Sequence, residues 1–221
     1  MLETLKEEVC EQNHELPRNG LVVGSGGNVS GRDPETGLIV IKPSGVKFSK
    51  LTPETMVVVD GDGNVVEGDM KPSVDTGIHL YIYRHRADVN GICHTHSPYA
   101  SSFAARGERI PAILTPITHI LGRDVPCSRY ATPGEVDTGQ AILEAADGGL
   151  AVLVKSHGPF TMGSSATEAT SIAMYLEEAA MTTHLAMLHG HVEELSQVEI
   201  DRCYAWFRQN YGQSGKKNVN S

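Results

Sequence analysis

Cysteine pairs, clustered positive charge and long apolar runs are all lacking in this sequence of 221 residues. Its four cysteines are scattered and form no C-x-x-C pair, which excludes a disulfide framework and predicts a reducing, cytoplasmic setting. A formal net charge of −9 argues against a nucleic-acid or anionic-membrane partner, because both need clustered positive charge. No apolar stretch reaches the roughly 18 residues of a membrane-spanning helix, and the first residues contain no signal-peptide core. A phosphorylated small substrate stays compatible with this composition, because a few local donors can hold one phosphate.

The hydrophobic pattern predicts one α/β domain. Helical spacing of apolar residues is found at 2–16, 73–86, 97–107, 166–189 and 198–212, and strand-like runs are found within 21–33, 38–46, 56–68, 89–96 and 150–158. Two apolar runs around Asp-Gly-Asp-Gly predict a β-hairpin, so the sheet is expected to be at least partly antiparallel. The polar segment 214–221 is expected to be a loose tail.

Two histidines, His94 and His96, stand one residue apart at the end of a predicted strand. Because residues i and i+2 of a strand share a face, their rings are expected to converge on one point. His157, at another predicted strand-to-loop boundary, offers a third imidazole, and Asp75 offers a carboxylate. Three neutral histidines with an open position make a catalytic zinc site. The chain has ten histidines, however, so the pattern alone also fits structural histidines that are hydrogen-bonded at strand ends.

Two glycine-rich turns indicate an anion-binding site. In "GSGGNVSG" (24–31) and "KPSGV" (42–46), glycines allow successive backbone N–H groups to converge on an anion. Asn28, Ser30 and Ser44 add side-chain donors, Lys42 adds charge, and the expected helix N-terminus at Ser73 is a third favourable position. Neither turn has the spacing of a P-loop or of a dinucleotide-binding fingerprint. Each turn alone fits an ordinary turn, but together they favour an anionic ligand.

Several motifs in one order resemble the class II aldolase and L-ribulose-5-phosphate 4-epimerase family. They are "GGNVSGRD", "IKPSGV", "VVEGDMKPSVDT", "GICHTHS", "VPCSRYAT", "SHGPF" and "YGQ". The resemblance implies a single three-layer α/β/α domain over 1–213 with a mainly antiparallel central sheet. It also implies Zn²⁺ or another divalent first-row metal, a small phosphorylated sugar as substrate, and a homotetramer with active sites at the subunit interfaces.

The resemblance assigns roles to individual positions of this sequence. It implies His94, His96 and His157 as metal ligands, with the Asp75 carboxylate beside the metal. The residues that match the substrate-phosphate loops, or that lie in them, are Gly27, Asn28, Lys42, Ser44, Gly45 and Ser73. Tyr211 matches a C-terminal tyrosine that serves as acid/base in a neighbouring subunit's site. His119 takes the place of the epimerase's acid/base aspartate, and an imidazole can shuttle a hydroxyl proton at neutral pH.

The residue at position 75 favours the epimerase branch of the resemblance. An aldolase such as that for L-fuculose 1-phosphate must remove a carbon proton, for which a longer glutamate is suited. The 4-epimerase breaks and re-forms the C3–C4 bond without removing a carbon proton, so Asp75 suffices. L-ribulose-5-phosphate 4-epimerase, forming D-xylulose 5-phosphate, is therefore the first expectation. Four departures from the family patterns are Val74, Thr115, His119 and Cys203.

Two other activities are compatible with the resemblance. An aldolase acting on L-fuculose 1-phosphate or a related ketose phosphate is the main alternative. A metal-free scaffold of the adducin kind is the other, although the retained histidines and Asp75 argue against it.

Overall fold

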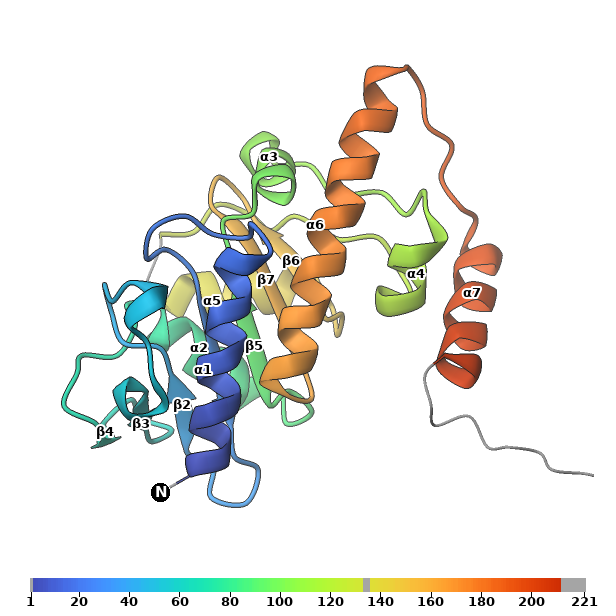
Figure 1. Ribbon diagram of the computed structural model, residues 1–221. Coiled ribbons are helices and arrows are strands. Elements are labelled where there is room, and N and C mark those ends of the chain that lie inside the picture. Colours follow the sequence, from blue (N-terminus) through green and yellow to red (C-terminus); the bar gives the residue numbers. More distant parts are fainter. Residues whose placement is uncertain (1, 133–135, 212–221) are drawn as a thin grey trace, which may run out of the picture.

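Two layers of helices enclose a central sheet in the computed structural model, which describes residues 2–132 and 136–211 (Figure 1). Within these residues seven strands pair in the order β4-β3-β2-β1-β5-β7-β6, and every neighbouring pair is antiparallel. The strands are β1 (Asn28–Arg32), β2 (Ile39–Ile41), β3 (Val57–Val59), β4 (Val65–Glu67), β5 (Gly91–His94), β6 (Ala151–Val154) and β7 (Gly158–Gly163). The predicted three-layer α/β/α fold and the predicted hairpin of β3 and β4 are confirmed.

One face of the sheet is covered by α2 (Thr76–His85) and α5 (Val136–Ala146). Ile78 and Ile142 of these helices belong to the same buried cluster as Ile39 and Ile41 of β2. Val40, between those two strand residues, belongs to the core on the opposite face, as the two-residue period of a strand requires. The inner strands are apolar on both sides because helices cover both faces of the sheet.

The other face is covered by α1 (Glu3–Arg18) and α6 (Ala166–Leu188), with α3 (Pro98–Arg106) beside α6 (Figure 1). Helix α6 begins at an N-cap, Ser165, whose hydroxyl accepts a hydrogen bond from the backbone N–H of Glu168. Its first turn lies directly over β5, where a Cβ placed on Gly91 would be 1.9 Å from the carbonyl oxygen of Ser165. Close contact between α6 and the sheet therefore depends on a glycine at position 91.

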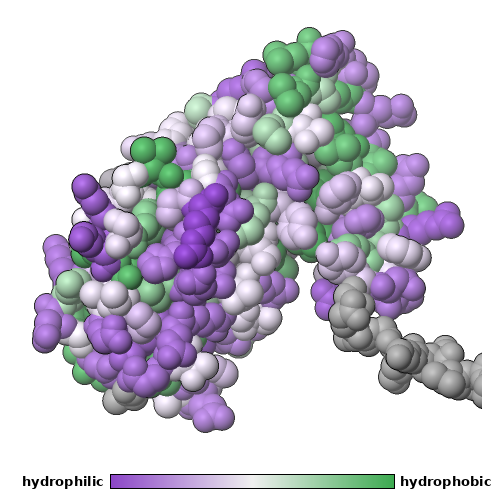
Figure 2. Space-filling view, in the orientation of Figure 1, coloured by the Kyte–Doolittle hydropathy of each residue, from purple (hydrophilic) through white to green (hydrophobic). Residues whose placement is uncertain are grey.

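Two further helices, α4 (Thr115–Leu121) and α7 (Gln197–Asn210), pack against each other at one side of the molecule (Figure 1). Helix α7 begins with a capping box between Ser196 and Glu199. Apolar side chains gather at the far end of α6, where Leu185, Met187 and Leu188 are exposed (Figure 2). Among the described residues, no helix is long and apolar enough to cross a bilayer.

Several predicted boundaries were wrong. The segment 21–33 does not begin as a strand, because Gly24 and Gly27 hold left-handed turns first and β1 follows them. Helix α1 continues through Pro17 to Arg18, because proline within the last turn costs the helix only one backbone donor. The limit at 213 and the tail at 214–221 lie outside the described residues.

Two elements next to the site also differ from prediction. Helix α2 begins at Thr76, with Asp75 at its N-cap position, because Ser73 forms a preceding turn in which its carbonyl oxygen accepts from the Thr76 N–H. The segment 150–158 is not one strand, because the chain turns after Val154 and a seventh strand, β7, runs back. The turn between β6 and β7 contains His157.

Candidate metal centre

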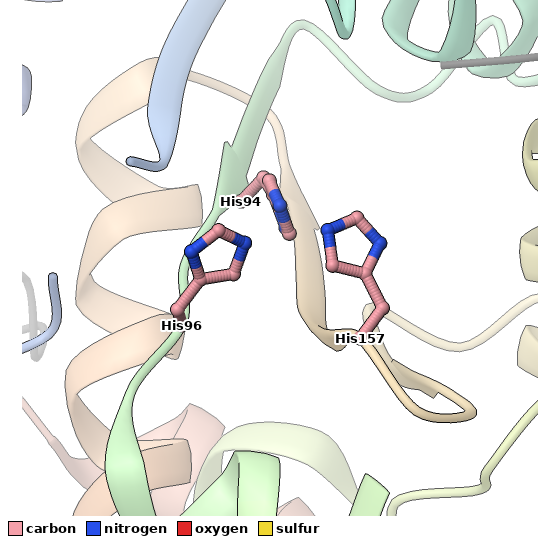
Figure 3. A group of neighbouring side chains, drawn as sticks. All are labelled: His94, His96 and His157. Atoms are coloured by element: carbon pink, nitrogen blue, oxygen red, sulfur yellow. The ribbon is translucent and has the colours of Figure 1, made fainter. Parts of the chain in front are cut away.

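Three histidines from two separate segments face one another at the end of β5 (Figure 3). Each offers a ring nitrogen, and these three atoms lie within 4.8 Å of one another. The ring centroids of His94 and His96 are 4.8 Å apart, and those of His94 and His157 are 4.7 Å apart. Nitrogens this close, converging on one point, are a donor set that suits a divalent cation.

Strand pairing sets the position of the buried member, His94. It is paired with Asn28 of β1 on one side and with Phe160 of β7 on the other. Its ring stacks on that of Phe160, at 4.1 Å between centroids, and its Nδ1 lies 3.0 Å from the carbonyl oxygen of Pro159. Because a carbonyl only accepts, Nδ1 carries the proton and Nε2 keeps its lone pair. This second contact is the usual way in which a metal-ligating histidine is oriented.

All three rings are neutral at neutral pH. Burial and the neighbouring His157 and His96 lower the pKa of His94 well below its usual range. Burial also lowers the pKa of His96, and burial together with His96 lowers that of His157. Neutral imidazole is the form that binds a metal, so the electrostatics of the centre fit a bound cation.

The histidines lie in a cleft of about 250 Å³ together with the six residues that the resemblance assigned to the phosphate loops. Ser30, which was also expected to donate to an anion, does not line this cleft, because its side chain is buried against His79 and Tyr83. Besides the histidines its lining consists of Ser25, Gly26, Gly27, Asn28, Lys42, Ser44, Gly45, Ser73, Val74 and Asp75. A cleft of this size suits a small molecule. The sequence interpretation did not assign Ser25 and Gly26 to the site, although both stand inside the glycine-rich stretch that it identified.

Asp75 is held at the cleft by Asn28. The amide Nδ2 of Asn28 donates to Oδ2 of Asp75 at 2.7 Å and to Oγ of Ser73 at 3.2 Å. Oδ1 of Asn28 is buried without a hydrogen-bond partner among residues 2–132 and 136–211. Asn28 was expected to supply a donor to a ligand, but here the protein itself uses its donors. The atom that Asn28 leaves for a ligand is an acceptor.

Lys42 is a buried lysine in the lining of the same cleft, with 2% of its surface exposed. Its Nζ donates to the carbonyl oxygen of Ser25 at 3.2 Å and lies 4.9 Å from the ring centroid of Phe48. Burial lowers the pKa of Lys42, and the negative charge of Asp75 acts in the opposite direction. A buried ammonium held by carbonyl oxygens gives the cleft a positive charge that favours an anionic ligand.

The glycine-rich turn lies against the backbone of the metal centre. Gly27 has φ +79°, and a Cβ there would be 2.6 Å from Cγ1 of Val22 and 2.8 Å from the carbonyl oxygen of His94. Only glycine combines this backbone conformation with so close an approach. The glycine at position 27 therefore allows the turn to pack directly against the backbone of His94, at the end of β5.

The two residues predicted as acid/base, His119 and Tyr211, lie elsewhere. The ring of His119 stacks on Phe207 at 4.8 Å between centroids, and Phe207 stacks on Tyr211 at 4.2 Å. These residues line a different cleft, of about 240 Å³, between α4, α6 and α7. Neither lines the cleft of the three histidines within one chain, so their acid/base roles stay predictions that need a neighbouring subunit.

The family assignment follows from a match over most of the chain. A family model described as Class II Aldolase and Adducin N-terminal domain matches residues 7–184. The chain belongs to the class II aldolase family. A solved structure named L-fuculose 1-phosphate aldolase is 33% identical, with a TM-score of 0.89, over 93% of this chain and 96% of that one.

Two further solved members of the class II aldolase family agree in fold. YgbL from Klebsiella pneumoniae, titled a putative aldolase/epimerase/decarboxylase, is 29% identical, with a TM-score of 0.82, over 92% of this chain and 99% of that one. An L-fuculose-1-phosphate aldolase from Thermus thermophilus is 25% identical, with a TM-score of 0.73, over 86% of this chain and 98% of that one.

A second buried histidine besides His94, His79 of α2, makes the stability of this member of the class II aldolase family pH-dependent. Burial lowers the pKa of His79 to about 3, with Asp75 opposing this shift and His94 adding to it. An unfolded histidine titrates near about 6.5, so below that pH the unfolded chain binds a proton that the folded chain does not. The stability that this group contributes is complete above about pH 6.5 and is lost as the pH falls toward 3.

We expect His79→Phe to remove about 2 kcal/mol of the stability loss that the metal-free wild type shows between about pH 7 and about pH 5. Urea denaturation at both pH values measures this difference. Because His94, His96 and His157 are present in both proteins, their own contributions cancel in the comparison. Equal losses in the wild type and the variant would contradict the assignment of this pH dependence to His79.

Proposed function

We propose that this protein cleaves a carbon–carbon bond of a small phosphorylated sugar by metal-dependent retro-aldol chemistry, and that it acts as an L-ribulose-5-phosphate 4-epimerase. The metal is Zn²⁺ or another divalent first-row ion. The proposal is supported by three neutral histidines and a carboxylate that share one cleft with two glycine-rich turns and a buried lysine.

Each part of the cleft has a chemical task in this proposal. A cation held by His94, His96 and His157, with Asp75 beside it, would supply Lewis acidity toward the sugar's vicinal oxygens. The backbone N–H groups of the turns at Gly27 and Gly45 would hold the phosphate. The ammonium group of Lys42 would balance part of the phosphate's negative charge. Oδ1 of Asn28 would accept a hydrogen bond from a sugar hydroxyl.

The observation that carries the epimerase assignment is the state of Asp75. Its side chain is short, it is 8% exposed, and its Oδ2 is held by Asn28 at 2.7 Å. A base that removes a carbon proton must reach that proton within hydrogen-bond distance. A short carboxylate fixed in this way is better suited to orienting groups in the cleft. The 4-epimerase reaction requires only this orienting role of the carboxylate, because it removes no carbon proton.

An aldolase acting on L-fuculose 1-phosphate or a related ketose phosphate is the second candidate. The similarity to an L-fuculose 1-phosphate aldolase over nearly the whole chain supports it at least as strongly as Asp75 supports the epimerase. Both reactions use the same cleavage step, so the common part of the proposal does not depend on the choice between them.

The assembly and the location are proposed together with the activity. A homotetramer with active sites at subunit interfaces would place Tyr211 and His119 of one subunit at the cleft of another. The exposed apolar end of α6 offers a surface for such contacts (Figure 2). A cytoplasmic location fits the absence of cysteine pairs.

Two incubations test the activity. We expect the purified, metal-loaded protein to convert L-ribulose 5-phosphate to D-xylulose 5-phosphate, measured by a coupled assay specific for the product. The parallel incubation with L-fuculose 1-phosphate is assayed for dihydroxyacetone phosphate. Release of that triose phosphate with no D-xylulose 5-phosphate from the first incubation would overturn the epimerase assignment in favour of the aldolase.

A further inference from the structure

Strand β1 and helix α2 are joined by a line of polar contacts on the buried side of the metal centre, here called the β1–α2 seam. The strand contributes alternate residues, which share one face, and the helix contributes residues one turn apart. The seam consists of Asn28, Ser30 and Arg32 of β1 and of Asp75, His79 and Tyr83 in or next to α2. The first of these pairs, Asn28 with Asp75, lies in the cleft itself.

The middle of the seam is fully enclosed. Oγ of Ser30 lies 2.7 Å from Nδ1 of His79 and 2.8 Å from the hydroxyl oxygen of Tyr83. Ser30 and His79 have no exposed surface, and Tyr83 is 3% exposed. With His79 neutral, the donors can run from the Tyr83 hydroxyl to Ser30 and on to Nδ1, or in the reverse order. The first order leaves the Nε2–H of His79 without an acceptor among the described residues, and the second leaves the Tyr83 hydroxyl proton without one.

The far end of the seam is a C-terminal cap on α2. The guanidinium group of Arg32 donates to the carbonyl oxygens of Tyr83 at 2.7 Å, Arg86 at 3.1 Å and Ala87 at 3.0 Å. Its Nε donates to Oδ1 of Asn90 at 3.1 Å. A helix end leaves several carbonyls unpaired, and one arginine satisfies these. Hydrogen bonds from a single strand therefore hold both ends and the middle of α2.

Polar contacts of this kind fix the position of a helix along its axis. Apolar packing alone tolerates a small slide, but a slide of α2 would leave the buried hydroxyls of Ser30 and Tyr83 and Nδ1 of His79 unpaired, which is costly. Asp75 directly precedes the first turn of α2, so the same slide would move its carboxylate within the cleft that it shares with the three histidines.

We propose that Ser30, His79 and Tyr83 are positioning residues that lock the register of α2 on β1 and so place the Asp75 carboxylate at the metal centre. The expected consequence is on metal affinity, because ligand-orienting contacts typically change affinity by about 10- to 100-fold when removed. This inference rests on the metal centre of the proposed function, and metal binding by the wild type tests that centre separately.

The test compares Ser30→Ala with Thr170→Val. Both changes remove a buried hydroxyl that makes a hydrogen bond, but Thr170 lies on α6, in the opposite helix layer, and bonds the carbonyl oxygen of Ala166. Zn²⁺ affinity is measured by competition with a chelating dye, and the melting temperature of the metal-free protein is recorded for each variant. We expect Ser30→Ala to weaken Zn²⁺ binding about tenfold and Thr170→Val to leave it within about twofold. Tyr83→Phe, which spares the contact between Ser30 and His79, should weaken binding by less than about threefold.

A double-mutant cycle separates positioning from general loosening. If Ser30 acts through Asp75, then Ser30→Ala should cause no further loss of Zn²⁺ affinity in a protein that already carries Asp75→Ala. The proposal is overturned if Ser30→Ala binds Zn²⁺ as tightly as the wild type, or if its loss of affinity persists without the Asp75 carboxylate. If Ser30→Ala does not fold, His79→Phe replaces it in the double-mutant cycle, because it removes the same contact between Ser30 and His79 and keeps an aromatic ring in the core. A wild type that binds no Zn²⁺ would instead refute the metal centre of the proposed function.

Discussion

Replacing His96 with alanine is expected to abolish metal binding and activity while leaving the fold intact. His96 lies beyond the end of β5 and is exposed, so its loss opens no cavity in the core. The two remaining imidazoles, even together with the Asp75 carboxylate, leave the cation without one of the three histidines that the proposal assigns to it. Because Lewis-acid assistance lowers a barrier by several kcal/mol, turnover should fall by about a thousandfold or more. Elemental analysis of the purified protein and a steady-state assay measure the two losses.

The matched control is His189→Ala. His189 is also exposed, but it stands at the C-cap of α6 and does not line the cleft. It should keep its metal, its activity and its melting temperature. Full activity in His96→Ala would contradict the metal assignment. Less than about a tenth of an equivalent of metal in the wild type, with no activity gained on adding a divalent ion, would favour the adducin-like scaffold instead.

Replacing Gly91 with alanine is expected to have the largest effect on stability. The added Cβ would lie 1.9 Å from the carbonyl oxygen of Ser165 and 2.4 Å from the backbone nitrogen of Ala166. Both atoms belong to the backbone at the start of α6, so no side-chain rotation relieves the clash. We expect a loss of more than about 4 kcal/mol of unfolding free energy, or a failure to fold, measured by urea denaturation.

Gly61→Ala is the control for this substitution. Gly61 lies in the turn between β3 and β4, and a Cβ there meets no atom within 4 Å. Its stability should change by less than about 0.5 kcal/mol. If Gly91→Ala were as stable as Gly61→Ala, α6 would not lie against β5 as closely as described. Because β5 also carries His94, partly folded Gly91→Ala should bind metal poorly as well.

The approach of His94, His96 and His157 to one another could be predicted from the sequence, but their surroundings could not. The two-residue period of a strand predicted that the rings of His94 and His96 converge, and they do lie 4.8 Å apart, but β5 ends at His94 and His96 follows it outside the strand. The convergence of His157 on them depends on the hairpin of β6 and β7, which was missed because the β7 sequence "GPFTMG" opens with Gly and Pro and has little alternation. Strand β1 was misplaced for a similar reason, since "NVSGR" has weak strand propensity and is held by strands on both sides.

The polar contacts around the three histidines could not be predicted from sequence patterns. Nothing in the spacing of Asn28 and Asp75 indicates that one side chain donates to the other, because the pair depends on how α2 packs on β1. Likewise, the stacking of His119, Phe207 and Tyr211 joins α4 to α7, two elements that are distant in sequence. Helix α4 itself was not predicted, since Pro116 and β-branched residues weaken its pattern.

The third histidine, His157, reaches the other two on a hairpin turn, after the chain has passed through α3, α4 and α5. A cation bound by His94, His96 and His157 would thus cross-link the two ends of the segment between residues 96 and 157, much as a disulfide would. Binding to the folded chain alone adds about 2.7 kcal/mol when the free ion stands at a hundred times its dissociation constant. The rate at which a cell degrades the protein would then depend on the supply of the ion. Metal starvation would speed its degradation as well as remove its activity.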